Sequence, residues 1–154
     1  MSAQPYPNGI DCVWLASDRD GHFGAFMTAG VGPIPLATLD YTNIPVEDIE
    51  GRLCELPLVS QAELLVSVKR PDDFIDLAER GVFVYDWADI NRTARAARRV
   101  YEPVAGPTRP ITASLLPSDL AALVEIVRLA DVAFAAMEAV DVRSLLSCAE
   151  ARAD

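Results

Sequence analysis

Two apolar runs flank an Asp-Gly pair in the stretch VWLASDRDGHFGAFM, residues 13–27 of the 154-residue chain. An Asp-Gly pair in this setting is a strong signal of a tight β-hairpin turn, because glycine adopts a positive φ angle without steric cost. We therefore predict two antiparallel strands within residues 10–16 and 23–29. Both faces of each run are largely apolar, which is typical of interior strands that are covered on two sides.

Helices are predicted further along the chain. A proline at an early position and acidic residues in the first turn are typical of a helix start. This pattern predicts helices over residues 45–53 and 71–80, and Gly81 ends the second of them. Ser118 follows a proline and predicts the N-cap of a third helix, which carries apolar residues as far as Val127.

The C-terminal segment 131–146 fits two alternatives. Its apolar residues continue the 3.6-residue period of the third helix, but a break near Asp131 followed by a strand over residues 132–135 fits as well. The remaining extended pieces are predicted from short β-rich runs at residues 34–39, 64–68, 82–85, 101–105 and 111–114.

Together these elements predict one α+β domain, with an antiparallel or mixed β-sheet packed by about three helices. The length is that of a single domain with one core, and no repeat or linker divides the chain. We therefore expect residues 1–154 to form a single globular domain. Residues 1–8 and 149–154 are candidates for disordered ends.

The charge balance limits the classes of partner. The chain has 13 Lys and Arg against 23 Asp and Glu, a formal net charge of −10. Proteins that bind nucleic acids normally have the opposite balance, so neither DNA nor RNA is expected as a partner. No apolar run approaches the ~20 residues of a membrane span, and the first residues lack the regions of a secretory signal. We expect a cytoplasmic protein with no membrane partner.

Residues suited to metal binding or nucleophilic catalysis are few: one histidine, His22, and three cysteines without a C-x-x-C pair. Zinc sites need three or four such ligands, so we expect no metal and no cofactor, and free thiols in a reducing compartment. His22 lies beside the predicted turn and is expected to face solvent without a chemical role. The fragment Asp18-Arg19-Asp20-Gly21 lacks the later oxygen ligands of a calcium loop.

Acidic residues gather in two segments. Residues 40–55 contain five acids against one arginine, and residues 72–80 contain four against one. They are either solvated helix faces that keep the protein soluble or a surface that docks a basic protein. Trp87 ends a predicted strand and fits the core as well as an interface anchor. The predicted partner-binding residues are Asp40, Glu47, Asp48, Glu50, Asp72, Asp73, Asp76 and Trp87.

The chain has one basic cluster, which falls in a polar segment over residues 90–99 that fits a short exposed helix or a loop. Four arginines spaced for one helix face offer contacts to phosphate or RNA, but the rest of the chain repels polyanions. Pairing with the acidic excess, or plain exposure, is the simpler interpretation. The cluster consists of Arg92, Arg95, Arg98 and Arg99.

Several stretches resemble segments of small bacterial proteins that are similar in size and acidity to the immunity proteins of polymorphic-toxin and contact-dependent inhibition systems. They are residues 13–22, 26–30, 32–35, 81–87 and 101–105, and they contain turn glycines, prolines and core aromatics. The resemblance implies a non-enzymatic protein that binds one toxin domain and occludes its active site, with no catalytic residue. The alternatives are a small-molecule or regulatory binding domain with an apolar pocket between sheet and helices, and a hydrolase or transferase that uses carboxylates.

Overall fold

The predicted hairpin forms the centre of the protein in the computed structural model, which describes residues 3–87 and 100–151. Strand β1 (Val13–Asp18) pairs antiparallel with β2 (Phe23–Met27), so that Trp14 lies opposite Phe26. Gly21 in the connecting turn has a φ angle of +80°. Every residue of both strands is buried, which confirms the prediction of interior strands.

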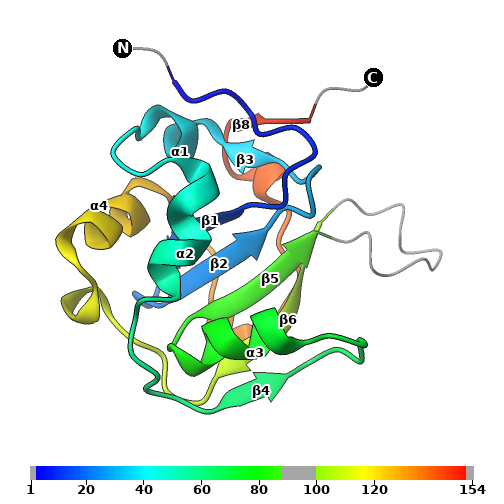
Figure 1. The fold of residues 1–154 in the computed structure, drawn as a ribbon, viewed down its shortest axis with the longest axis vertical. Helices are drawn as coiled ribbons and strands as arrows, with labels where there is room; N and C mark the ends of the chain where they lie inside the picture. The colour runs from blue at the N-terminus through cyan, green and yellow to red at the C-terminus, as the bar shows by residue number, and fades with distance from the viewer. Residues whose placement is uncertain (1–2, 88–99, 152–154) are drawn as a thin grey trace.

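The hairpin lies within a six-stranded mixed sheet of order β4-β6-β5-β2-β1-β7 (Figure 1). The pairs β2–β5 and β1–β7 are parallel, and the other neighbours are antiparallel. Strands β3 and β8 form a separate two-stranded sheet. This arrangement confirms the predicted α+β class with a mixed sheet. The remaining strands are β3 (Ile34–Pro35), β4 (Ala62–Leu64), β5 (Phe83–Trp87), β6 (Tyr101–Pro107), β7 (Arg128–Leu129) and β8 (Cys148–Ala149).

Helices cover one face of the sheet. In Figure 1, α2 lies in front of β1 and β2, and α3 lies below it in front of β5 and β6. Helices α2 and α4 contact β1, whereas α3 contacts β5 and β6. The helices bury Leu53, Leu77 and Leu123 in the core, because these side chains lie on their inward faces. In the described part of the chain, the helical elements before residue 130 are α1 (Leu36–Asp40), η1 (Val46–Asp48), α2 (Ile49–Leu53), α3 (Asp72–Glu79), η4 (Ala113–Leu115) and α4 (Ser118–Ile126).

Aromatic rings fill the opposite face. The Trp14 ring stacks on Phe26 with centroids 4.2 Å apart, and Phe26 stacks on Tyr85 at 4.8 Å. Phe134 packs against the same rings, 5.9 Å from Phe26 and 5.5 Å from Tyr85. It begins η5 (Phe134–Ala136), and η6 (Val142–Ser144) follows. The C-terminal segment, orange in Figure 1, therefore covers the sheet from behind.

Several predicted boundaries are wrong. Helix α4 ends at Ile126, and residues 131–146 form neither the predicted long helix nor the strand over 132–135 but two 3₁₀ turns. The reason is tertiary: after α4 the chain pairs with β1 through β7, and Phe134 then packs on the aromatic face. The segment 90–99 with its four arginines lies outside the described residues.

Shorter elements also differ from the sequence predictions. The run at 64–68 contributes only its first residue to β4, and the segment 111–114 forms a 3₁₀ turn instead of a strand. Helix α1 replaces most of the extended piece expected at 34–39. These segments are short and lie at the periphery, where tertiary contacts override weak local preferences.

The chain ends are better anchored than the sequence suggests. The Gln4 side chain donates to the Tyr41 carbonyl at 2.7 Å and accepts from the Val46 N–H at 2.7 Å. The Tyr6 hydroxyl donates to the Gly32 carbonyl, and Ala149 pairs with Ile34. These contacts join Gln4, Tyr6 and Ala149 to the rest of the fold. Residues 1–2 and 152–154 lie outside the described part of the chain.

Candidate partner-binding face

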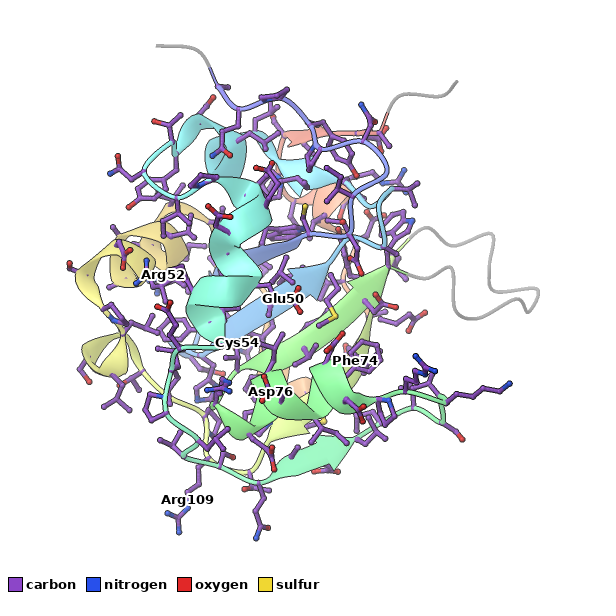
Figure 2. All side chains as sticks on the ribbon, in the orientation of Figure 1. Glu50, Arg52, Cys54, Phe74, Asp76 and Arg109 are labelled. Carbon is purple, nitrogen blue, oxygen red and sulfur yellow. The ribbon has the colours of Figure 1, made fainter. Side chains whose placement is uncertain are left out.

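Helices α2 and α3 bring the two acidic segments of the sequence together. Figure 2 shows Glu50 on α2 and Asp76 on α3 on the same side of the molecule, with Cys54 between them. The Cys54 thiol lies 3.5 Å from the Asp76 carboxylate, which joins the end of α2 to α3. We call the surface formed here the α2–α3 acidic face, and its residues are Asp11, Glu47, Glu50, Asp73 and Asp76.

Like charges on this face act on one another. The pKa of Glu50 is raised, first by burial and then by the negative charges of Asp73, Asp11 and Asp76. Both effects disfavour the ionised carboxylate. Asp73 and Asp76 lie on a different helix from Glu50, which indicates that the two acidic segments share one electrostatic environment.

The buried thiol of Cys12 lies beneath the α2–α3 acidic face and is affected by the negative charges of that face. Burial raises the pKa of Cys12 to about 11, and the negative charges of Glu47, Asp11 and Glu50 add to this effect. Cys12 lies just before β1, so the field of the acidic face extends to the edge of the sheet. A high pKa keeps this thiol protonated, and we therefore assign it no nucleophilic role.

The nearby arginines neutralise the face only in part. Arg80 forms an ion pair with Asp76 at 3.1 Å. Arg52 follows Glu50 closely in sequence, but its guanidinium donates to Asp119 on α4 and lies 3.1 Å from Glu55. In Figure 2, Arg52 accordingly extends away from α3 toward α4. Within the described residues, neither Glu50 nor Asp73 forms an ion pair.

The remaining predicted acids have a different arrangement. Asp48 and Asp72 are exposed, at the end of η1 and the start of α3, and they border the acidic face. Asp40 is also exposed but ends α1, which lies on the far side of α2 from α3 in Figure 1. The structure therefore brings Glu47, Glu50, Asp73 and Asp76 together and leaves Asp40 apart.

Trp87 does not belong to this surface. Its side chain is 3% exposed and packs edge-on against Tyr101, with ring centroids 5.0 Å apart. The prediction of a surface anchor is wrong because Trp87 continues the inward-facing row of β5 that contains Phe83 and Tyr85. Phe74, next to Asp73 on α3, is a half-buried aromatic residue that packs against the core with one side and leaves the rest of its ring accessible beside the acidic face.

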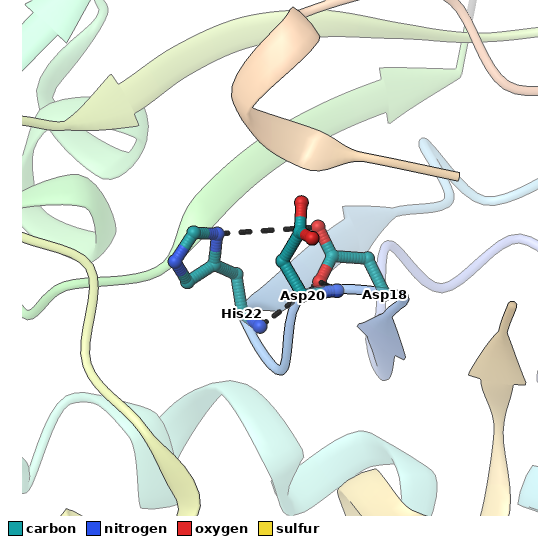
Figure 3. Close-up of side chains that lie close together, drawn as sticks. All are labelled: Asp18, Asp20 and His22. Atoms are coloured by element: carbon teal, nitrogen blue, oxygen red, sulfur yellow. Dashed lines mark hydrogen bonds and ion pairs between the residues drawn. The ribbon is translucent and has the colours of Figure 1, made fainter. Parts of the chain in front are cut away.

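The β1–β2 turn holds a second polar cluster (Figure 3). Asp18 is completely buried, and its carboxylate accepts the backbone N–H groups of Asp20 and His22 at 2.9 Å each. The His22 side chain is 26% exposed, and its Nδ1 lies 4.0 Å from an Asp18 oxygen. The sequence correctly placed His22 beside the turn, but it did not predict that Asp18 is the buried centre of that turn.

A cavity of about 320 Å³ lies beside this turn, between Arg19 and the C-terminal segment. Charged side chains line it together with apolar ones, including Arg19, Asp131, Glu138 and Asp141. It differs from the apolar pocket between sheet and helices that a small-molecule binding domain was expected to have.

Comparisons of the chain with protein-family models, with curated proteins and with solved structures find no match. Among the described helices, none combines the length and apolar character required to cross a membrane. The functional interpretation therefore depends on the geometry of the two clusters described above.

Proposed function

We propose that this protein is an immunity-type inhibitor that binds a basic toxin domain through the α2–α3 acidic face and blocks the active site of that toxin. The observation that supports this proposal is the convergence of Glu50, Asp73 and Asp76 from two helices, with the Glu50 carboxylate destabilised by its neighbours. A surface of this kind gains free energy when a positively charged partner relieves the repulsion.

Toxin domains that act on nucleic acids bind phosphates through lysine and arginine side chains. An array of carboxylates occupies such a site as the phosphates would, and it excludes the substrate without any chemical step. Half-buried Phe74 supplies apolar contact area beside the charges, as aromatic side chains commonly do at interfaces. On this proposal the protein is not an enzyme and has no catalytic residue.

The proposed place of action is the cytoplasm, and the proposed partner is a protein instead of a nucleic acid or a membrane. Cys12, Cys54 and Cys148 are all free thiols, in agreement with a reducing compartment. The net charge of −10 disfavours direct binding to polyanions.

The reading frame immediately upstream of this gene is the first candidate for the toxin, and co-expression with its product tests the proposal. We expect the wild-type chain to rescue growth and to form a stable complex whose association slows in added salt. The double variant Glu50→Lys/Asp73→Lys should weaken the complex by at least about 10-fold, because each reversed charge meets a basic partner.

The matched control is Glu125→Lys/Asp131→Lys, which changes the net charge equally at exposed positions on α4 and beyond β7. Its dissociation constant should remain within about 3-fold of wild type, since rim charges outside an interface contribute little. Equal weakening by both double variants would show a non-specific charge effect and contradict the assigned face. Rescue without a stable complex would contradict occlusion.

A further inference from the structure

We propose that the β1–β2 turn binds one divalent transition-metal ion through Asp18, Asp20 and His22. The two carboxylates and the imidazole each present a ligand atom, and these atoms lie within 4.8 Å of one another. Figure 3 shows the three side chains directed toward a common point above the turn. This site is independent of the α2–α3 acidic face, which lies on the other side of the sheet.

Asp18 is held in a fixed orientation for this role. One of its oxygens accepts the N–H groups of Asp20 and His22, and the other accepts the N–H of Phe134 at 2.7 Å. A carboxylate has about four lone-pair sites. Three are therefore used by the backbone, and the oxygen that faces His22 retains one for a metal ion.

His22 supplies the second ligand atom through the Nδ1 nitrogen of its imidazole ring. Its Nδ1 is buried and has no hydrogen-bond partner among the residues that the structure describes. At 4.0 Å from the Asp18 oxygen it is too distant for a hydrogen bond. The imidazole ring packs beside Phe83, with centroids 5.7 Å apart. A buried nitrogen without a partner is costly, and a metal ion between the two atoms would satisfy it.

Asp20 is the most exposed ligand of the three. Its side chain is 48% exposed, and its one ion pair in the described part of the chain is a long contact of 3.9 Å with Arg19. Ligand atoms around a tetrahedral ion with bonds of about 2.1 Å lie about 3.4 Å apart. Rotation of the exposed Asp20 and partly exposed His22 side chains closes the remaining distance to the fixed Asp18 oxygen.

The ligand set selects the class of ion. One imidazole and two carboxylates suit Zn²⁺ and related first-row ions, which bind three protein ligands and leave a position for water. Ca²⁺ requires six to eight oxygen ligands, which this turn does not offer. Bound to Asp18, the ion would stabilise both the hairpin turn and the attachment of Phe134 to it.

The test uses the full, tag-free chain and zinc chloride as the only probe. Because His22 is the single histidine, the imidazole signals in an NMR spectrum report this site alone. We expect Zn²⁺ to shift these signals in a saturable one-site titration, and Ca²⁺ to bind at least about 10-fold more weakly. Unmoved imidazole signals at saturating zinc, or equal affinity for calcium, would overturn the proposal.

Two variants localise the binding by calorimetry. His22→Gln and Asp20→Asn should each weaken zinc binding by at least about 10-fold, since each removes one of three ligands. Cys54→Ser removes an exposed thiol that is remote from the turn, and it should leave the affinity unchanged. Zinc affinity at the wild-type level in folded His22→Gln, or loss of binding in Cys54→Ser, would place the metal elsewhere.

Discussion

The carboxylate of Asp18 accepts the backbone N–H of Phe134 at 2.7 Å, across 116 residues of sequence. The same carboxylate closes the β1–β2 turn through the N–H groups of Asp20 and His22. One buried side chain thus joins the central hairpin to the C-terminal segment that covers its aromatic face. The turn and the cover are therefore expected to depend on each other.

Replacing Asp18 with alanine should destabilise the protein severely. Three backbone N–H groups would lose their acceptor, and hydrogen bonds to charged groups contribute about 1.5–3 kcal/mol each. We expect the free energy of unfolding in urea to fall by at least about 3 kcal/mol. Asp131→Ala, an exposed control, should change it by less than about 0.5 kcal/mol. Similar effects of the two variants would contradict the role of Asp18.

Two buried tyrosines should respond oppositely to loss of the hydroxyl group. The Tyr101 hydroxyl accepts from the Trp14 indole at 3.1 Å and donates to the Pro33 carbonyl at 3.0 Å. Within residues 3–87 and 100–151, the Tyr85 hydroxyl has no hydrogen-bond partner. Tyr101→Phe should therefore cost about 1–3 kcal/mol of unfolding free energy.

Tyr85→Phe is the matched control and should be neutral or stabilising, because it removes an unsatisfied buried hydroxyl. Chemical denaturation of both variants in parallel measures the difference. A larger loss for Tyr85→Phe than for Tyr101→Phe would show that the Tyr85 hydroxyl has a partner after all.

The raised pKa of Glu50 predicts a pH dependence of stability. A carboxyl group whose pKa is higher in the folded state binds more protons there, so its contribution to stability decreases as pH rises through that range. The cost of burying the charged carboxylate, together with its repulsion by Asp73, Asp11 and Asp76, is then fully present at neutral pH and absent below the ordinary pKa of 4.5.

Glu50→Gln should accordingly stabilise the protein at pH 7, by no more than a few tenths of a kcal/mol because the site is partly exposed. The advantage should disappear at pH 4 and diminish in high salt. Urea unfolding at both pH values checks this, with Glu125→Gln as an exposed control. A stabilisation of equal size at both pH values would exclude charge repulsion as its cause.

Two glycines should respond oppositely to alanine. Gly81 follows α3 with a φ angle of +92°, and a Cβ atom there would lie 2.5 Å from a methyl group of Ile111. Gly51 lies within α2, and a Cβ atom there would meet nothing within 4 Å. Gly81→Ala should cost more than about 1 kcal/mol through strain and overlap.

Gly51→Ala should instead stabilise the protein by about 0.5–1 kcal/mol, since alanine favours the helix and restricts the unfolded chain. Thermal unfolding of the two variants under one buffer condition measures both effects. Destabilisation by Gly51→Ala would indicate that the exposed side of α2 is less open than the structure shows.

Local chemistry explains which elements were predictable. The Asp-Gly turn before His22, and the proline and acids that begin α3, act over only a few residues. They were therefore visible in the sequence, as were the apolar runs of β1 and β2. The segment 131–146 remained ambiguous because its apolar spacing fits a helix, whereas its path depends on where Phe134 packs.

The candidate site shows the same division. Its acidic composition was evident from residues 40–55 and 72–80. The packing of α2 and α3 on the sheet places Glu50 near Asp73 and leaves Asp40 apart. Trp87 was wrongly assigned to the partner-binding surface, because the sequence of a strand end does not reveal whether other segments of the folded chain bury it.

The order of residues thus established the hairpin, the α+β class and the negative charge, since turn geometry, side-chain periodicity and ionisation are properties of neighbouring residues. Only the folded chain established which charges converge and which ring covers which strand. Those relationships arise from packing between segments separated by many residues, and local preference contains no information about such distances.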